Sequence, residues 1–373
     1  MKKVLHISKY YFPFRGGTEQ IAQECVSALK GRYEQKVICF NHGQKDKIDV
    51  VDGIEIVRAG CFAKVSSQSL SSSYGKLLKE MIATFAPDII IFHYPNPFVA
   101  HWLLKYCRTD SRLVIYWHLD IVRQKILGRL FGDQNRKLIK RADKIFATSP
   151  NYIEGSKWLR QVREKCVVVP NCINAARFKQ SAEVEAKAVE VREKNKGKII
   201  CLAVGRHTEY KGFIYLIRAS KYLDERFRIF IIGKGGSTEQ LKKEAKGDDK
   251  IQFLGLIPDM DLKAYMTAMD IFCFPSITKN EAFGLALAEA MYYEKPSVTF
   301  TIDGSGVNYV NLDGITGIEV PNRDVKAYAD AMTRLADDPS LREQYGKASR
   351  KRVVENFLDR DFAEKIRREI VGL

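Results

Sequence analysis

The strongest constraint on the fold is an alternation along the chain between short runs rich in Val and Ile and longer stretches with helical spacing. Short, continuous apolar runs are typical of strands buried on both faces, and the intervening segments can form the helices that join parallel strands. We therefore expect parallel β-sheets covered by helices. The strands expected in the first set span residues 4–8, 36–40, 54–58, 89–93, 113–118, 144–148 and 166–169.

The same alternation then starts again. A second set of strands is expected at residues 199–204, 228–232, 251–254, 271–274, 297–300 and 317–320. The residues between the two sets are charged and have no strand pattern, and 373 residues exceed the size at which one hydrophobic core usually stops growing. We predict one domain at 1–175, a second at 176–350, and a C-terminal helix at 351–373 that packs back on the first domain.

Functional residues are expected where strands end. In open α/β sheets, ligands bind beyond the carboxyl ends of the strands, so two such domains facing each other predict a central cleft. The first expected strand is followed by Gly16 and Gly17 and then by a helical pattern. A glycine pair at a helix start lets backbone N–H groups approach an anion, and a turn that serves only chain geometry is an equal alternative.

Two cations follow the first expected strand of the second domain. Arg206 and Lys211 lie on the loop between this strand and a helix. Such a pair can neutralise a diphosphate, the arginine through forked hydrogen bonds and the lysine as a point charge. Taken alone, the pair is more typical of solvated surface cations. Gly233 follows the next strand in another turn that would let a ligand approach the backbone.

The most informative motif runs from Glu281 to Glu289. A loop carries Glu281 and a helix is expected from Phe283, which leaves the N–H groups of Phe283, Gly284 and Leu285 without helical partners. Glu289 lies roughly six residues into that helix, about 9 Å along its axis. The hydroxyls of a sugar nucleotide, on its sugar and on its ribose, are separated by a distance of this order. The alternative is a capping acid and a buried acid balanced by a lysine.

Taken together, these residues resemble the retaining glycosyltransferases of family 4. The resemblance covers nearly the whole chain and implies the α/β fold called GT-B, with two Rossmann-like parallel-sheet domains facing a central cleft. Residues 303–317 are similar to a subset found among O-antigen and capsule assembly enzymes, some of them mannosyltransferases. The residues that carry the resemblance are Gly16, Gly17, Gly205, Arg206, Lys211, Gly212, Glu281, Phe283, Gly284, Leu285 and Glu289.

The resemblance also implies roles for individual residues. Glu281 would hold the donor sugar, and Glu289 would accept hydrogen bonds from the ribose. His118, at the end of an expected strand, matches the histidine that the family places near the transferring sugar; a hydrogen-bonded core histidine is the alternative. The implied catalytic set is His118, Glu281, Arg206 and Lys211. The implied donor-binding set is Gly16, Gly17, Arg206, Lys211, Gly233, Ile257, Glu281, Ala282, Phe283, Gly284, Leu285 and Glu289.

The sequence departs from the family pattern at three places. Asn171 is followed by Cys172 where the family usually has glycine, and Ala282 stands where glycine is common. Ser305 and Gly306 stand where many members have two glycines. These departures leave the sugar and the base of the donor open.

The resemblance predicts a retaining, metal-independent hexosyltransferase. It would move a hexose from GDP-mannose or a UDP-hexose to a saccharide or polyprenyl-linked saccharide in surface polysaccharide assembly. Neither a metal nor a cofactor is expected, since the sugar nucleotide is a substrate, and electrostatic stabilisation of the leaving diphosphate should be the largest catalytic contribution. A sugar-nucleotide 2-epimerase of the same fold is one alternative, because one fold can host several reactions.

The chain is strongly basic, with 61 Lys and Arg against 45 Asp and Glu. This charge attracts anions in general, which include nucleic acid, anionic lipid and nucleotides. Residues 123–144 combine eight basic residues with apolar residues at helical spacing. They predict either a helix lying on an anionic membrane or a core-facing helix with a solvated basic face. A noncatalytic polyanion-binding protein is a further alternative, but no nucleic-acid partner is expected because a donor already explains the cations at strand ends.

The remaining patterns indicate where the protein works. The N-terminus starts as a strand and not as a secretory signal, and no apolar run is long enough to cross a bilayer. Eight scattered cysteines, mostly in apolar runs, indicate buried thiols in a reducing compartment. We expect a cytoplasmic protein, peripheral on the inner face of the membrane. The serine-rich segment 66–73 is expected to be a mobile loop at the cleft or a flexible linker.

Overall fold

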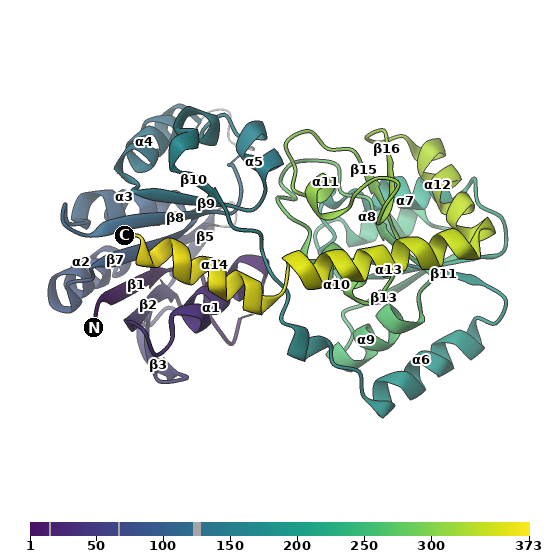
Figure 1. Cartoon of the computed structure of the whole chain (residues 1–373), viewed down its shortest axis with the longest axis horizontal. Helices are drawn as coiled ribbons and strands as arrows, with labels where there is room; N and C mark the ends of the chain where they lie inside the picture. The colour runs from purple at the N-terminus through teal and green to yellow at the C-terminus, as the bar shows by residue number, and fades with distance from the viewer. Residues whose placement is uncertain (15, 66–67, 122–127) are drawn as a thin grey trace. The chain divides into compact units, whose positions relative to one another are not determined.

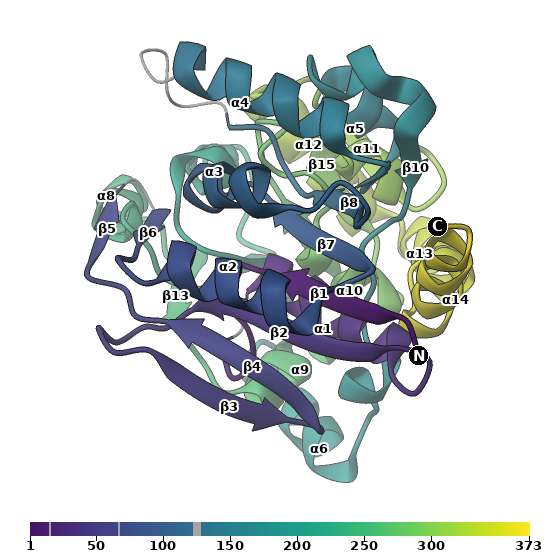
Figure 2. The same ribbon diagram turned by 90° about the vertical axis from the view of Figure 1, so that its left-hand side faces the viewer.

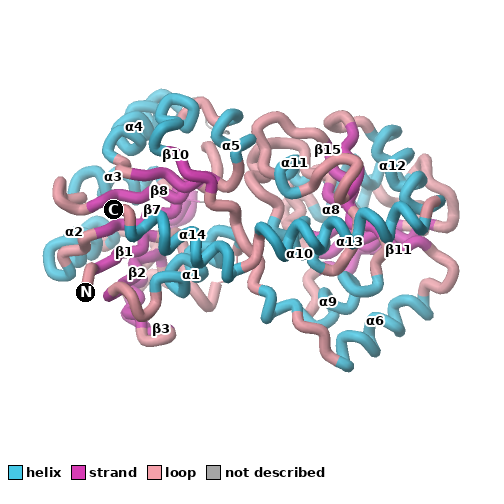
Figure 3. The backbone as a smooth tube through the Cα atoms, in the orientation of Figure 1, coloured by secondary structure: helices cyan, strands magenta, loops and turns pink. Residues whose placement is uncertain are grey.

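The computed structural model divides the chain into two compact units. It describes residues 1–14, 16–65, 68–121 and 128–373. Unit 1 comprises Met1–Asn171 together with Arg360–Leu373, and unit 2 comprises Cys172–Asp359. Strands and helices alternate along both units, as the colours of Figure 3 show. The predicted α/β class with parallel sheets is confirmed.

Unit 1 is built on an eight-stranded sheet and a two-stranded hairpin. Its strands are β1 (Lys3–Ile7), β2 (Glu34–Phe40), β3 (Lys47–Val51), β4 (Ile54–Ala59), β5 (Ala63–Val65), β6 (Gln68–Leu70), β7 (Ile89–Tyr94), β8 (Arg112–Trp117), β9 (Lys144–Ala147) and β10 (Cys166–Val168). The order is β10-β9-β8-β7-β1-β2-β4-β3, and only the edge strand β3 is antiparallel to its neighbour. All six residues of β7 are buried, because helices cover both faces of a parallel sheet.

The helices of unit 1 come from both ends of the sequence. They are α1 (Gly17–Leu29), α2 (Tyr74–Phe85), α3 (Pro97–Tyr106), α4 (Gly128–Arg141), α5 (Pro150–Gly155), η1 (Leu159–Lys165) and α14 (Asp359–Val371). Figure 2 shows α2 and α3 side by side over the sheet. On α14, the side chains of Phe362, Ile366 and Ile370 are buried.

Polar contacts also fix α14 on unit 1 (Figure 1). Arg367 Nε donates to the carbonyl oxygen of Ala28 at the end of α1, at 2.7 Å. Lys144 Nζ donates to the backbone carbonyl of Glu369 at 2.8 Å and forms an ion pair with its carboxylate at 3.1 Å. The last helix of the chain therefore belongs to the unit with which the chain begins.

Unit 2 is built on a six-stranded sheet in which every neighbouring pair is parallel. Its strands are β11 (Ile199–Val204), β12 (Phe227–Ile232), β13 (Ile251–Gly255), β14 (Ile271–Phe274), β15 (Ser297–Phe300) and β16 (Gly317–Val320). Their order is β13-β12-β11-β14-β15-β16. The strand order reverses between β11 and β14, which is where open α/β sheets bind ligands.

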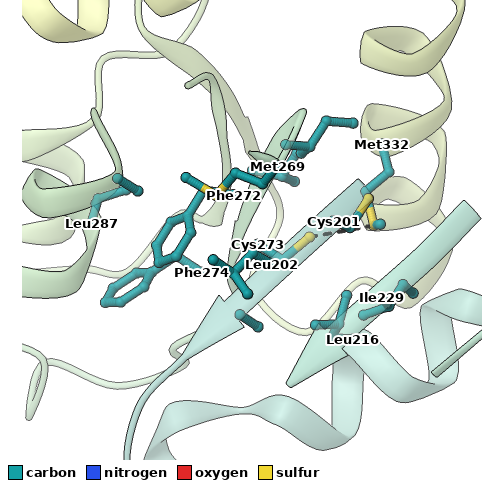
Figure 4. Packing of buried hydrophobic residues seen from close by; sticks show 14 of the residues in the cluster. Cys201, Leu202, Leu216, Ile229, Met269, Phe272, Cys273, Phe274, Leu287 and Met332 are labelled. Atoms are coloured by element: carbon teal, nitrogen blue, oxygen red, sulfur yellow. Dashed lines mark hydrogen bonds between the residues drawn. The ribbon is translucent and has the colours of Figure 1, made fainter. Parts of the chain in front are cut away.

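Helices of unit 2 pack on this sheet around one apolar core. They are η2 (Ala175–Phe178), α6 (Ala182–Lys194), η3 (Glu209–Lys211), α7 (Phe213–Ser220), α8 (Thr238–Glu244), α9 (Asp259–Ala268), α10 (Leu285–Tyr292), α11 (Val307–Val310), α12 (Val325–Asp337) and α13 (Pro339–Asn356). Figure 4 shows Leu202, Phe272, Cys273 and Met332 at the centre of the core. Cys273 Sγ lies 4.0 Å from Met332 Sδ, so this cysteine fills space as an apolar side chain would.

Three expectations differ from the structure. The helix predicted at 351–373 is the end of α13 followed by a separate helix, α14, because Phe357 and Leu358 leave the helical path between them. The serine-rich segment predicted as a mobile loop or flexible linker contains β6 at Gln68–Leu70, which pairs antiparallel with β5. The basic helix predicted at 123–144 is α4, Gly128–Arg141, and residues 122–127 lie outside the described chain.

Within the described part of the chain, none of the helices combines the length and the apolar character needed to cross a bilayer.

Candidate functional site

The loops that follow β11 and β12 are in direct contact in unit 2. Gly205 follows β11 and Gly233 follows β12, and a Cβ atom on Gly233 would lie 1.9 Å from the carbonyl oxygen of Gly205. Gly233 has a φ of 129°, a conformation that only glycine adopts without strain. His207 N donates to the carbonyl oxygen of Lys234 at 3.1 Å and joins the same loops further on. Close approach of the two loops therefore requires glycine at position 233.

The loop after β11 is also joined to the loop after β14. Lys211 ends the short helix η3, and Gly212 follows it with a φ of 64°. A Cβ atom on Gly212 would lie 2.0 Å from the carbonyl oxygen of Pro275. The N–H of Ile277 donates to the carbonyl oxygen of Tyr210 at 2.9 Å. These contacts hold Lys211 against the segment that leads to the first motif glutamate.

Lys211 and Glu281 form a largely buried ion pair. Their side chains are 13% and 11% exposed, and Lys211 Nζ donates to Glu281 Oε2. The Ser276 hydroxyl donates to the same oxygen at 3.2 Å. Burial opposes the charged form of Lys211, but the Glu281 carboxylate and Tyr210 outweigh it, so the pKa of Lys211 lies above its ordinary value. The lysine is therefore held as a cation.

The backbone around Glu281 is supported by the segment that follows β15. The buried hydroxyl of Ser305 donates to the carbonyl oxygen of Glu281. A Cβ atom on Gly306 would lie 2.1 Å from the carbonyl oxygen of Ala282. The residues that the sequence analysis noted only as departures from the family pattern thus hold the motif loop in place.

Arg206 differs from Lys211 in its surroundings. It lies on the same loop but is exposed, and its side chain forms no hydrogen bond or ion pair with any residue the structure describes. One cation of the loop is thus committed to Glu281, and the other is available to an anionic ligand. A guanidinium in that state can bind phosphate oxygens through two parallel hydrogen bonds.

The helix of the motif begins two residues later than predicted. The predicted start at Phe283 is wrong because Gly284 takes a φ of 93°, so α10 begins at Leu285. The first hydrogen bond to the helix start runs from Ala288 N to Gly284 O at 3.0 Å, which leaves the preceding N–H groups without helical partners. Phe283 is a core residue whose ring meets Phe357 edge-on at 5.3 Å.

Glu289 lies on α10 and its carboxylate has no direct partner. Within the described chain it forms no hydrogen bond or ion pair, although Arg177 and Lys211 act on it electrostatically. Burial raises the pKa of Glu289 to about 7, against the lowering effect of Arg177 and with a raising effect of Asp259. The carboxyl group therefore changes charge near neutral pH.

The remaining predicted residues of unit 2 lie near the end of β13. Gly233 N donates to the carbonyl oxygen of Gly255 at 2.8 Å, which brings the Ile257 segment next to the Gly233 turn. The Ile257 side chain lines a hollow of about 610 Å³ together with Leu254 and Tyr265. This hollow is lined by residues of β12, β13, α6 and α9, and Ile257 also packs against the apolar core of unit 2.

His207 is a residue that the sequence analysis passed over. It is buried, and its Nδ1 lies 3.0 Å from the hydroxyl oxygen of Thr238. Burial and the nearby Lys242 lower its pKa, so the imidazole is neutral and structural. The signal for it in the sequence is its position between Arg206 and Lys211 on the same loop.

The predicted residues of unit 1 lie at the carboxyl ends of two strands of its sheet. Gly17 begins α1, and Gly16 precedes it in an extended conformation. A Cβ atom on Gly16 would lie 2.3 Å from a carboxylate oxygen of Glu19, so an anion at this helix start would meet an acidic side chain. His118 follows β8 and is buried, and His93 Nδ1 lies 3.0 Å from its Nε2. Burial lowers the pKa of His118 to about 3, so its imidazole is neutral.

Two acidic residues, Asp259 and Asp261, form an Asp-x-Asp sequence at the start of α9. Asp259 forms an ion pair with Lys263 at 3.1 Å, and Asp261 forms one with Lys187 at 2.6 Å. Both carboxylates are therefore engaged by lysines in this structure.

Two units built on parallel sheets, with a buried lysine–glutamate pair and a free arginine at strand ends, define a two-domain α/β protein of the GT-B fold. Residues 15–177 match the family model Glycosyltransferase Family 4, and residues 184–352 match Glycosyl transferases group 1. The chain belongs to this family of glycosyltransferases. The predicted family and fold are confirmed.

Individual relatives extend over nearly the whole chain. The D-rhamnosyltransferase WbpZ of Pseudomonas aeruginosa is 30% identical over 361 residues, which are 95% of this chain and 92% of that protein. The O-antigen chain mannosyltransferase C of Escherichia coli is 28% identical over 95% of this chain and 94% of its own length. Anabaena Alr3699/HepE, solved with UDP and glucose, covers all of both chains with a TM-score of 0.79 at 16% identity.

Proposed function

We propose that the protein transfers a hexose, with retention, from a nucleoside-diphosphate sugar to a saccharide or polyprenyl-linked saccharide of a surface polysaccharide. The observation that carries the proposal is the loop of unit 2 on which Lys211 is paired with Glu281 while Arg206 is free. The names of the two relatives, an O-antigen mannosyltransferase and a rhamnosyltransferase, support GDP-mannose or a related donor, with a UDP-hexose as the other candidate.

In the proposed reaction, Arg206 and Lys211 bind the diphosphate. Glu281 accepts hydrogen bonds from sugar hydroxyls and Glu289 from the ribose, and the free N–H groups at the start of α10 face oxygen atoms of the donor. The bond from the anomeric carbon to the phosphate oxygen breaks, and the acceptor oxygen bonds to the same face of the sugar. The acceptor proton passes to the departing phosphate. The two cations stabilise the charge that develops there, so the proposal requires no metal.

The burial of the ion pair gives Lys211 a defined role in this proposal. In the free protein the ammonium group is neutralised by Glu281, which limits the cost of holding a charge in a poorly hydrated place. When a donor binds, the diphosphate supplies a second anion, and the Glu281 carboxylate is freed in part to accept from the sugar. The positive charge of Lys211 and the hydrogen-bond acceptor of Glu281 are thus in place before the sugar nucleotide binds.

Transfer assays with two variants test the proposal. A donor is first chosen by thermal shift, because a ligand that binds the folded protein raises its melting temperature. Glu281→Ala and Lys211→Ala should each lower transfer by roughly 10²-fold or more, the effect of removing a group that stabilises the transition state. Lys250→Ala is the matched control, because Lys250 forms an ion pair with Asp248 at similar burial, 15% and 12% exposed.

Two outcomes would overturn the proposal. Full activity of both Glu281→Ala and Lys211→Ala would remove the site from the reaction. Turnover of the sugar nucleotide without any acceptor, giving a 2-epimer, would favour the epimerase of the same fold. Loss of activity in the Lys250→Ala control as well would show that any buried ion pair of unit 2 matters equally.

The acceptor side of the proposal concerns α4 in unit 1. Leu138 and Ile139 on this helix are buried, while Arg136, Lys137 and Lys140 are exposed. We place the protein on the cytoplasmic face of an anionic membrane, where such a basic face would bring it to a lipid-linked acceptor. Sedimentation with lipid vesicles measures this part separately from transfer.

A further inference from the structure

The imidazole of His118 is held at its edge by a second histidine. His93, in β7, places its Nδ1 3.0 Å from His118 Nε2. The two rings are nearly coplanar, with 13° between their planes and 5.3 Å between their centroids. A hydrogen bond in the plane of both rings fixes the rotation of the His118 ring.

The face of the His118 imidazole is held as well. The Tyr116 ring lies 4.4 Å from it, with 10° between the planes. The Tyr116 hydroxyl is itself within hydrogen-bond distance of the carbonyl oxygen of Val169, at 2.8 Å, and of Asn171 Oδ1, at 3.1 Å. His118 is therefore constrained at one edge and at one face.

Only one hydrogen is available for the contact between the two histidines. Burial holds the pKa of His118 at about 3, and it also holds that of His93 well below its ordinary value, with smaller lowering effects of His118 and His6. Both rings are therefore neutral, and each carries a single N–H. Either His93 donates from Nδ1, or His118 donates from Nε2.

The surroundings of His93 distinguish these two arrangements. His93 Nε2 is buried and has no hydrogen-bond partner among the residues described. If His118 were the donor, the hydrogen of His93 would be on this Nε2, as a buried N–H group without an acceptor. Orphaned buried N–H groups are rarer in proteins than acceptors with an unused lone pair.

We infer that His93 donates its Nδ1 hydrogen to His118 and thereby fixes the hydrogen of His118 on Nδ1. His93 is then a positioning residue, and His118 presents a hydrogen-bond donor to its ligand. This inference rests on the proposed function for the part that concerns catalysis.

The inference defines the chemistry that His118 offers. Its Nδ1 makes no hydrogen bond to other residues in the described chain. An Nδ1–H group suits an oxygen acceptor, such as a phosphate oxygen or a hydroxyl oxygen of the donor sugar. The same tautomer has no lone pair on Nδ1, so His118 would not take a proton from the acceptor at that atom.

Nitrogen NMR of the full chain, labelled with ¹⁵N at its six histidines, tests the inference directly. The ring nitrogens with and without hydrogen differ in chemical shift, so the spectrum reports the tautomer of His118, assigned through a His118→Gln variant. We expect the hydrogen on Nδ1. A spectrum with the hydrogen on Nε2 would overturn the inference without reference to activity.

Three variants connect the tautomer to its cause. His93→Leu removes the donor and should abolish the preference for Nδ1–H and lower kcat by about tenfold or more, since a positioned donor contributes roughly 10²-fold. His93→Asn places an amide nitrogen near the former Nδ1 and should restore both in large part. His6→Gln changes another buried histidine of the sheet, bonded to Gln35 at 2.8 Å, and should leave the tautomer and kcat unchanged.

The outcomes separate the inference from the proposed function. A His93→Leu chain that remains folded, loses the tautomer and keeps its full kcat would overturn the positioning role. An unchanged tautomer in His93→Leu would show that His93 is not its cause. The expected tautomer in a chain without transfer activity toward any donor would support the hydrogen-bond assignment and overturn the proposed function instead.

Discussion

The acid on α10, Glu289, predicts a stability that depends on pH. Burial raises the pKa of Glu289 from 4.5 to about 7. A pKa difference of one unit corresponds to about 1.4 kcal/mol, so the ionised side chain should cost the folded chain about 3 kcal/mol, an upper bound for a side chain that is not fully enclosed. Glu289→Gln keeps the shape of the side chain and cannot ionise, so it should relieve this cost.

The sign of the effect follows from the two protonation equilibria. Below pH 4.5 the carboxyl group is protonated in the folded and in the unfolded chain, and it has no effect on stability. Between 4.5 and about 7 the unfolded chain releases a proton that the folded chain keeps, so the parent loses stability as the pH rises through the folded pKa. Glu289→Gln should therefore gain less than about 1 kcal/mol at pH 5 and about 3 kcal/mol at pH 8.

The assay must report on unit 2. The three tryptophans, Trp102, Trp117 and Trp158, all lie in unit 1, so tryptophan fluorescence follows the other unit. Hydrogen exchange of the peptides that cover α10, measured at pH 5 and pH 8 and corrected for the intrinsic exchange rate, gives the free energy of opening at the site.

A second variant of the same motif should change the stability of unit 2 in the opposite direction. Glu281→Gln removes the anionic partner of Lys211 and should destabilise unit 2 by about 3 kcal/mol at pH 8, because a buried cation is left unpaired. The reasoning is refuted if Glu289→Gln changes the opening free energy equally at pH 5 and pH 8. In that case the carboxyl group does not titrate in the folded chain near neutral pH.

Two further predictions concern a loop and a surface. Gly212→Ala should destabilise the chain by more than about 1 kcal/mol and lower transfer, since its φ of 64° and the Pro275 carbonyl 2.0 Å from the new Cβ would displace the Lys211 loop. Gly197→Ala, at a φ of 75° with open space around it, should lower the stability but not the transfer rate. Melting temperature and transfer rate are measured for both variants. An equal loss of transfer in the two variants would contradict the argument about the Lys211 loop. The chain should sediment with anionic vesicles and not with neutral vesicles. A Lys137→Glu/Lys140→Glu double variant should bind the anionic vesicles more weakly. Equal sedimentation of the parent and the variant would contradict the proposal that α4 contacts the membrane.

The parallel strands could be predicted from the sequence because they are continuous apolar runs, a pattern with few alternatives in a chain of this length. The edge strand β3 could not be predicted in this way. Its apolar residues Ile48 and Val50 are 67% and 71% exposed, so they alternate on a solvent face and do not form a run. The hairpin of β5 and β6 was missed for another reason. Ser69 is fully buried, with its hydroxyl 2.7 Å from the Tyr10 hydroxyl, and serine composition alone indicates a loop.

In the candidate site, too, some features could be predicted from the sequence and others could not. The positions of Lys211 and Glu281 at strand ends could be predicted from the sequence, but their ion pair was not predicted. The contacts that orient such residues could not be predicted, since Ser305 is 24 positions from Glu281, and His93 is 25 from His118. These partners meet only through the order of strands in the sheets, which a single sequence does not specify.

The contacts of α14 have a consequence for the way in which the chain is made. Unit 1 lacks its last helix until all of unit 2 has left the ribosome, because Cys172–Asp359 precedes Arg360–Leu373 in the sequence. During that time Lys144 has no Glu369, and the carbonyl oxygen of Ala28 has no Arg367. The first unit to be translated is thus the last to be completed. A premature stop just before Arg360 would therefore damage the unit formed by Met1–Asn171.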